Sequence, residues 1–493
     1  MALALMAWAL PLAGEELALP AELSLDDAIA LRLELDGAEI EARTVRDGPP
    51  TLRAEVLEVD AEGRPRAASL QIDSVDGVPT LRRAAARPTP RLRLELRLDP
   101  RQALTVVGGD LQVTIEDPLL PADEERLQDF EEELEGERFR DREDDKREDE
   151  PEDPTRGILT LELRESQLDV LGGRAMVVQA DRSWVRLDRC GDRAELTVNG
   201  GSFDVVGHRG SVDVLATDAR GSVSGLDGPL KADLLGGTLD LDDARGTLDL
   251  TGAGAIVRAT RWVGKTTVDS TDGDLELREI ESARGTKIKA TGGRVAIADW
   301  TGRLDLEVAV ADLDVDTLTG DAVARFGEQV QADMRAISGR LRLESDDSDL
   351  ELAAVGRADL EMRRGVLRVD DVRQLGVTGE ELDVTGSGIA QIVAFEVVDS
   401  TVDLDLGAVP RRGTTRLRLL GLSTADVQLE PPCVVQVQAD GELDGVQVEA
   451  DGCDLRLPGQ PLVSFKSRRR YGDKPQNLTL TLSEDAEVQV GAF

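Results

Sequence analysis

Short runs of alternating apolar and polar residues recur along most of this chain. The phrase glycine, any residue, apolar, polar, apolar occurs at Gly210–Val214, Gly237–Leu241, Gly246–Leu250, Gly273–Leu277, Gly302–Leu306 and Gly339–Leu343. Alternation with a period of two directs successive side chains to opposite faces of a β-strand, and glycine marks a turn. Many short strands without helical periodicity predict an all-β fold, a single-stranded β-solenoid or β-helix.

The same alternation predicts which side chains face the core. The apolar pairs should point inward, namely Leu239 and Leu241, Leu248 and Leu250, Leu275 and Leu277, Leu304 and Leu306, and Leu341 and Leu343. The residues between them should point outward, namely Asp240, Asp249, Glu276, Asp305 and Arg342. A solenoid core of stacked leucines and valines therefore carries carboxylates on its outside.

The spacing of the phrases leaves the length of one coil open. Gly210 and Gly237 are 27 residues apart, which fits three sides of nine residues each. A shorter spacing of nine separates Gly237 from Gly246 and also fits two sides, with about twenty residues per coil. Between these two lengths, the main repeat region would make about 12–16 coils.

The pattern divides the chain into five segments. Residues 1–14 are apolar and uncharged, like the hydrophobic region of a secretory signal, but lack its basic flank. Residues 15–89 predict an irregular β region, either a small sandwich or a cap. Residues 90–120 and 157–493 predict the first rungs and the main solenoid. Residues 121–156 hold eighteen acidic and seven basic residues with few apolar ones, which predicts a mobile acidic insertion.

Composition limits the partners of this chain. The net charge is −40, from 98 acidic and 58 basic residues. Such a surface repels nucleic acid and anionic membranes, so neither is expected as a partner. Beyond the N-terminus no run approaches 18 apolar residues, so no membrane span is expected. Aromatic residues make up 2% of the chain, so the core must be built from Leu, Val, Ile and Ala.

The residues that most often carry catalysis or bind metals are few. His208 is the single histidine, which excludes most catalytic triads and histidine-based metal sites, and we expect it in an exposed turn. Cys190, Cys433 and Cys453 lack CxxC spacing, so neither zinc nor redox chemistry is assigned. Cys433 and Cys453 would be near neighbours if one coil takes about twenty residues, which leaves a disulfide or free thiols open.

Two further groups of residues were weighed as sites. Acidic turns at Asp269–Asp274, Asp312–Asp316 and Asp346–Asp349 offer oxygen ligands for Ca²⁺, but none has the spacing of a known calcium loop. Trp184, Trp262 and Trp300 could stack on sugar rings, or could fill the core or turns. No residue is therefore assigned as catalytic, cofactor-binding or metal-binding, and no cofactor is expected.

The run Leu92–Ile115 and the repeats from Gly210 to Leu343 resemble the bacterial putative-adhesin family of head-GIN-like β-solenoid repeats. The resemblance covers about residues 90–490, is one of pattern alone, and includes no catalytic motif. It implies an exported, non-enzymatic protein of the cell envelope, periplasm or exterior, acting as a scaffold or adhesin-like binding protein. Its partner would be an unknown protein or a surface glycan.

Two alternatives remain at this stage. A bactofilin-like cytoskeletal solenoid would stack end to end, but the high net charge opposes stacking at low salt, and the signal-like N-terminus does not fit. A β-helix enzyme acting on polysaccharide would need outer-face carboxylates and exposed aromatics, and aromatics are scarce here.

Overall fold

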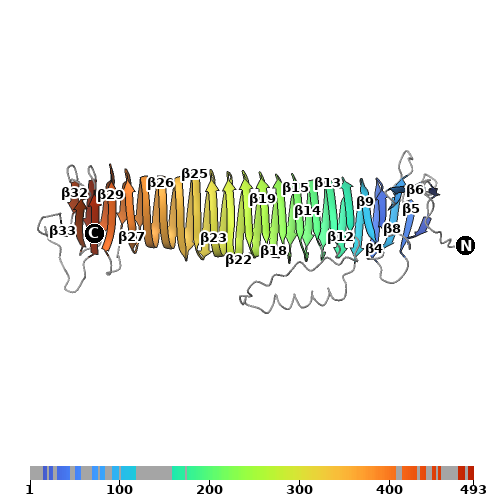
Figure 1. The fold of residues 1–493 in the computed structure, drawn as a ribbon, viewed down its shortest axis with the longest axis horizontal. Coiled ribbons are helices and arrows are strands. Elements are labelled where there is room, and N and C mark those ends of the chain that lie inside the picture. The colour runs from blue at the N-terminus through green and yellow to red at the C-terminus, as the bar shows by residue number, and fades with distance from the viewer. Residues whose placement is uncertain are drawn as a thin grey trace, which may run out of the picture. The chain divides into compact units, whose positions relative to one another are not determined.

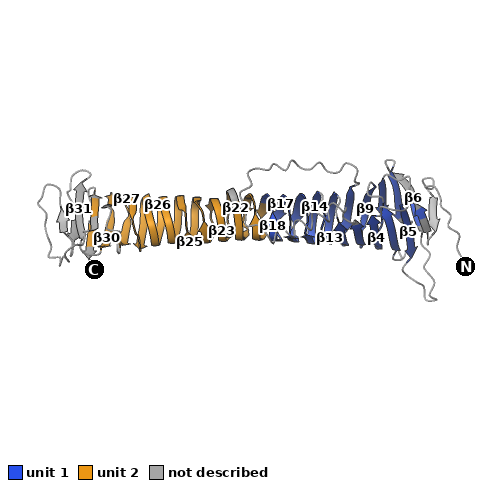
Figure 2. Ribbon diagram, turned by 90° about the horizontal axis from the view of Figure 1, so that it is seen from below, with its two compact units in different colours: residues 1–250 blue, residues 251–493 orange. Residues whose placement is uncertain are grey.

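In the computed structural model, the chain is all-β and contains no helix among the residues it describes. These are residues 15–18, 21–25, 30–44, 50–56, 69–75, 78–83, 92–98, 102–117, 158–172, 175–191, 193–406, 414–429, 433–439, 447–450, 454–456, 476–482 and 487–492. The chain divides into two compact units, Met1–Leu250 and Thr251–Phe493 (Figure 2). Each unit is a β-solenoid, and the described residues make about 14 turns in all, within the predicted range.

Strands in the first unit are short and regularly spaced (Figure 1). They are β1 (Glu15–Ala18), β2 (Ala21–Ser24), β3 (Ala30–Glu34), β4 (Ala38–Thr44), β5 (Thr51–Val56), β6 (Ser69–Val75), β7 (Val78–Arg83), β8 (Leu92–Leu98), β9 (Ala103–Gly109), β10 (Gln112–Asp117), β11 (Leu159–Arg164), β12 (Gln167–Gly172), β13 (Met176–Asp188), β14 (Ala194–Val206), β15 (Val212–Thr217), β16 (Arg220–Ser224), β17 (Leu230–Leu235), β18 (Thr238–Arg245) and β19 (Leu248–Ala253), the last of which runs past the boundary.

In the second unit several strands continue around a corner. They are β20 (Ile256–Val263), β21 (Thr266–Thr271), β22 (Asp274–Thr291), β23 (Arg294–Ala309), β24 (Asp312–Thr319), β25 (Ala322–Ile337), β26 (Arg340–Ser387), β27 (Ile392–Val398), β28 (Thr401–Asp405), β29 (Thr414–Leu420), β30 (Thr424–Leu429), β31 (Cys433–Ala439), β32 (Gln447–Ala450), β33 (Asp454–Arg456), β34 (Gln476–Leu482) and β35 (Glu487–Ala492).

One coil has two sides and about 18 residues. Val212 of β15 pairs in parallel with Leu230 of β17, while Arg220 of β16 pairs with Thr238 of β18. The chain therefore alternates between a first sheet (β3, β9, β11, the N-terminal halves of β13 and β14, β15, β17) and a second sheet (β4, β10, β12, the C-terminal halves of β13 and β14, β16, β18). The three-sided, 27-residue coil is wrong. Its interval equals three half-coils of nine, so it joins phrases on opposite sheets.

The core lies between the two sheets and consists of stacked aliphatic side chains. Every predicted inward leucine is buried: the pairs at 239/241, 248/250, 275/277, 304/306 and 341/343 are each at most 3% exposed. The five predicted outward residues are half-buried or exposed. Register explains this order, because parallel pairing places each inward side chain above its counterpart one coil earlier.

The corners between the sheets follow the same 18-residue repeat. One corner has a residue with positive φ in every coil, at Arg182, Gly200, Asp218 and Gly236. The following position is small in each coil, at Ser183, Gly201, Ala219 and Gly237. A Cβ on Gly201 would lie 2.2 Å from the carbonyl oxygen of Ser183, so this column accepts only what the coil below leaves room for.

Buried serines bind successive coils at this corner. Ser183 Oγ accepts a hydrogen bond from the backbone N–H of Ser166 at 3.0 Å and donates one to the carbonyl of Asp181 at 2.9 Å. Ser166 Oγ in turn accepts from the N–H of Leu111 at 3.0 Å. Each hydroxyl thus satisfies backbone groups that the turn leaves outside the strand ladder.

Antiparallel strands cover the N-terminal end of the first unit. β3 and β4 pair in parallel with β9 and β10, so they are coil strands themselves. Beyond them β5 pairs antiparallel with β8, and β6 pairs antiparallel with β7. The edges are then short, since β1 and β2 have four residues each. Short antiparallel strands at the end of a parallel stack limit further edge pairing, as a cap does.

Strand order at the C-terminal end departs from chain order. β29 pairs with β34, and β34 pairs with β31, all in parallel. On the other sheet β30 pairs with β35, and β35 pairs with β32. The chain therefore passes over one coil, builds the next with β31 and β32, and returns to fill the omitted coil with β34 and β35.

Two predicted segments fall outside the described residues. These are the signal-like residues 1–14 and the acidic insertion 121–156. Cys453, one of the two cysteines considered for a disulfide, also lies outside them.

Candidate functional site

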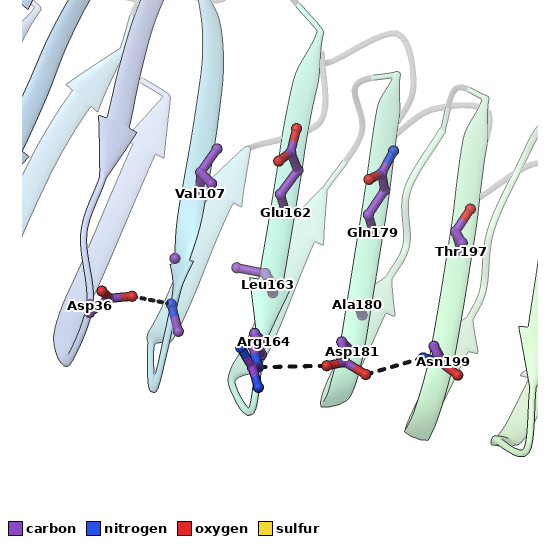
Figure 3. Close-up of a pocket in the computed structure, with 12 residues that line it drawn as sticks. Asp36, Val107, Glu162, Leu163, Arg164, Gln179, Ala180, Asp181, Thr197 and Asn199 are labelled. Atoms are coloured by element: carbon purple, nitrogen blue, oxygen red, sulfur yellow. Dashed lines mark hydrogen bonds and ion pairs between the residues drawn. The ribbon is translucent and has the colours of Figure 1, made fainter.

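A groove of about 460 Å³ lies on the outer face of the first sheet in the first unit (Figure 3). Its floor and walls come from successive strands at equivalent positions. One row contains Val107, Glu162, Gln179 and Thr197, which are partners in register across β9, β11, β13 and β14. The second row, two residues further along each strand, contains Gly109, Arg164, Asp181 and Asn199.

The groove exists because β9 ends in two glycines. Gly108 faces inward, where a Cβ would lie 1.6 Å from the carbonyl oxygen of Leu35, so no other residue fits there. Gly109 faces outward and leaves the second row without a side chain between Asp36 and Arg164. A Cβ on Gly109 would have its nearest neighbour, Asp36 Oδ1, at 3.4 Å, and Gly109 has no positive φ. The outer position is therefore empty by sequence and open to substitution.

Polar contacts hold the side chains of the second row in place (Figure 3). Asp36 Oδ1 accepts a hydrogen bond from the N–H of Gly109 at 2.7 Å. The carboxylate of Asp181 lies between two partners, with Arg164 Nε at 3.7 Å and Asn199 Nδ2 at 3.2 Å. Carboxylate, guanidinium and amide groups thus alternate along the row at the strand spacing, and they offer both donors and acceptors to a ligand.

Two exposed leucines continue the two rows. Leu215 is paired in register with Thr197 and is 53% exposed. Leu235 is paired with Thr217, follows the row of Asn199, and is 60% exposed. Exposed leucines on adjacent strands give the polar groove an apolar end on the same sheet face. A patch of this kind beside hydrogen-bonding groups is typical of a binding surface.

A charged group lies directly before the groove. Glu34 of β3 is paired with Val107 and continues the first row. Hydrogen bonds from Arg82 and from Arg32, the latter at 2.8 Å, lower the pKa of the Glu34 carboxyl against the opposing effect of its partial burial. Glu34 is therefore held as a carboxylate and limits the groove on its N-terminal side.

The prediction for His208 is wrong. Its side chain is 1% exposed and lies at the corner between β14 and β15. The N–H of Arg209 donates to the carbonyl of Cys190, and the N–H of Asp227 donates to the carbonyl of His208. These bonds stack His208 between Cys190 and Leu226, both buried, in one inward corner column. The turn is exposed as a whole, but the 18-residue repeat directs this position inward.

The tryptophans do not form one platform. Trp262 and Trp300 are 0% and 1% exposed and belong to the core. Trp184 is half-buried on the outer face of the second sheet, between Gln167 and Ser202 in register. Within the described residues, then, the aromatic side chains are not gathered at the groove.

The acidic turns considered for Ca²⁺ do not converge. In the part of the chain that the structure describes, no group of three or more His, Cys, Asp or Glu side chains is placed to hold a metal ion. Those residues likewise include no helix with the length and apolar character that crossing a membrane requires.

Comparisons with known proteins add little. No family model and no curated protein matches this sequence. Among solved structures, a match described as a “putative adhesin from Parabacteroides distasonis ATCC 8503” is 13% identical, covers 71% of this chain and 97% of the matched chain, and has a TM-score of 0.21. A TM-score this low supports no transfer of function. The named family thus agrees with the resemblance in the repeats, and the groove has to be interpreted from its own residues.

The sequence gave no direct sign of the groove. Gln179, Thr197 and Asn199 are ordinary polar positions in alternating strands, and only the 18-residue period would have placed them in rows. The pair Gly108-Gly109 was the available signal, because a glycine at an outward strand position leaves a gap in its row.

Proposed function

We propose that this protein is an exported, non-enzymatic, adhesin-like binding protein, and that its ligand is an extended glycan bound along the groove of the first sheet. The carrying observation is the pair of parallel rows of carboxylate, amide, hydroxyl and guanidinium groups that end at Leu215 and Leu235. Sugars present hydroxyls that both donate and accept, and such mixed rows satisfy them. Exposed apolar side chains pack against the CH faces of sugar rings.

Geometry supports an extended ligand over a compact one. The groove crosses four neighbouring strands, and strands lie about 4.8 Å apart. The same kinds of groups therefore recur at a spacing close to the length of one sugar unit. A chain of several units could contact each strand in turn, with weak contacts adding up along the face.

Binding can be tested with one matched pair of variants. We expect the full chain to bind a subset of glycans on an array, and Gly109→Leu to reduce affinity for the best of them at least tenfold by calorimetry. The leucine fills the groove where a Cβ has room, so the fold should be kept. Thr114→Ala, outward on the second sheet, is the control and should bind like the unchanged chain.

Three results would contradict the proposal in different parts. Unchanged affinity in Gly109→Leu would place the ligand elsewhere on the molecule. A chain that binds no glycan but captures a protein would overturn the ligand class. New reducing ends from a bound glycan, abolished by Asp181→Asn, would make the protein an enzyme. Fractionation of the native host tests export, since a cytoplasmic, filamentous pool would favour the bactofilin-like alternative.

A further inference from the structure

The second unit has a coil that is filled out of chain order. β34 (Gln476–Leu482) lies between β29 and β31, and β35 (Glu487–Ala492) lies between β30 and β32. All four pairings are parallel and in continuous register. Without β34 and β35, a slot one coil wide would separate β29 and β30 from β31 and β32.

The inserted strands are held as core strands. Leu478, Leu480 and Leu482 of β34 are fully buried, and Val488 and Val490 of β35 are at most 2% exposed. Each strand has hydrogen-bonded neighbours on both sides, unlike a strand added at the end of a stack. The slot therefore offers two strand edges per sheet and an apolar interior to whichever segment enters it.

The connection to the inserted strands is longer than the slot requires. β33 ends at Arg456, beside Gln436 of β31, and β34 begins at Gln476, beside Cys433. These ends differ by three residues along the strand and two strand spacings across it, so about 14 Å would join them. The intervening residues 457–475 span at most about 60 Å when extended. The connection is long enough to reach a slot in a neighbouring molecule.

We propose that Gln476–Ala492 is an exchangeable segment that can fill the same slot in a second copy of this chain, giving a dimer with reciprocally exchanged C-terminal strands. Every contact inside the slot is the same whether the segment comes from its own chain or from another. The two arrangements therefore differ only in the connection and in the entropy of association, and protein concentration decides between them. This proposal is independent of the glycan-binding groove, which lies in the first unit.

Cysteine pairs can detect the exchange directly. Asp426 of β30 and Gln489 of β35 are in register and both exposed, so cysteines there lie within disulfide reach. In a full chain whose native cysteines are replaced by alanine, Asp426→Cys and Gln489→Cys would be made separately, mixed, unfolded and refolded at high concentration. We expect a covalent dimer after mild oxidation, and a dimer mass by light scattering.

Two controls make the test decisive. The double variant Asp426→Cys with Gln489→Cys, refolded when dilute, should form the link within one chain. Asp403 of β28 is in register with Asp426, and neither residue lies on the exchanged segment. Mixed single variants Asp403→Cys and Asp426→Cys should therefore give no link between chains.

Contrary outcomes are equally clear. A double variant that links only within one chain at every concentration, with no link in the mixed pair, would show a slot closed to exchange. Equal linking between chains in the test mixture and in the control mixture would show nonspecific association. A double variant that forms no link would show that β35 does not occupy the slot. Each of these results overturns the proposal.

Discussion

The two adjacent glycines at one corner of the first unit give a sharp test of coil stacking. Gly200 and Gly201 both have positive φ, at 66° and 78°. A Cβ on Gly200 would lie 3.4 Å from Cγ of Arg182, a side-chain atom that can move. A Cβ on Gly201 would lie 2.2 Å from the carbonyl oxygen of Ser183, which is backbone of the previous coil. The same substitution therefore meets different surroundings at neighbouring positions.

The expected cost follows from these contacts. Gly200→Ala pays only for the left-handed backbone, about 1 kcal/mol, and its column already holds Arg182 and Asp218 with positive φ. Gly201→Ala pays a similar amount plus about 1–3 kcal/mol for moving one coil away from another. Both lose the same freedom in the unfolded chain, so that effect cancels between them.

Urea unfolding of both variants, followed by circular dichroism, measures the difference. We expect Gly201→Ala to unfold at a clearly lower urea concentration than Gly200→Ala, with similar slopes. Equal midpoints would refute the reasoning, because they would mean that the corner of one coil does not rest on the coil before it.

Further predictions concern single buried or charged groups. Ser183→Ala should cost about 1–3 kcal/mol in urea unfolding, because it leaves the N–H of Ser166 without its acceptor; a neutral effect would contradict the serine ladder. Gly221→Ala should destabilise the first unit, since its Cβ would lie 2.0 Å from Cζ of Phe203, and Phe203→Leu should partly restore stability; an additive double variant would argue against this contact. Hydrogen bonds from Arg357 and Arg340 outweigh burial and lower the pKa of Asp359 from 3.8. That carboxylate should stabilise the second unit by about 1 kcal/mol above pH 4 and lose this effect as the pH falls below 3.8. Asp359→Asn should therefore be less stable at pH 7 and match the unchanged chain near pH 2, and a pH-independent difference would contradict it.

The strand pattern was predictable because it depends on neighbours in the sequence. Alternation in Gly237–Leu241 fixes which side chains face the core, and the buried Leu239 and Leu241 confirm it. Coil length was not predictable in the same way. Nine-residue phrases look alike on both sheets, so only the pairing of Val212 with Leu230 distinguishes two sides from three.

Features that depend on distant pairing were the ones missed. His208 is buried because Cys190 and Leu226 lie directly before and after it in the stack, which its local sequence does not reveal. The order of β29, β34 and β31 depends on which strand fills a slot first, and all three alternate in the same manner. The groove likewise arises from Gly109 meeting Arg164 across a gap of many residues.

The pairing of β9 with β11 shows how much the corners tolerate. Leu104 stands beside Leu159 in unbroken register, although residues 118–157 are spliced between their coils. A graft at such a site disturbs neither the ladder nor the packed interior, since the polypeptide leaves and re-enters at the rim. Evolution, or a protein engineer, could thus hang new modules along this architecture one after another and leave its frame intact.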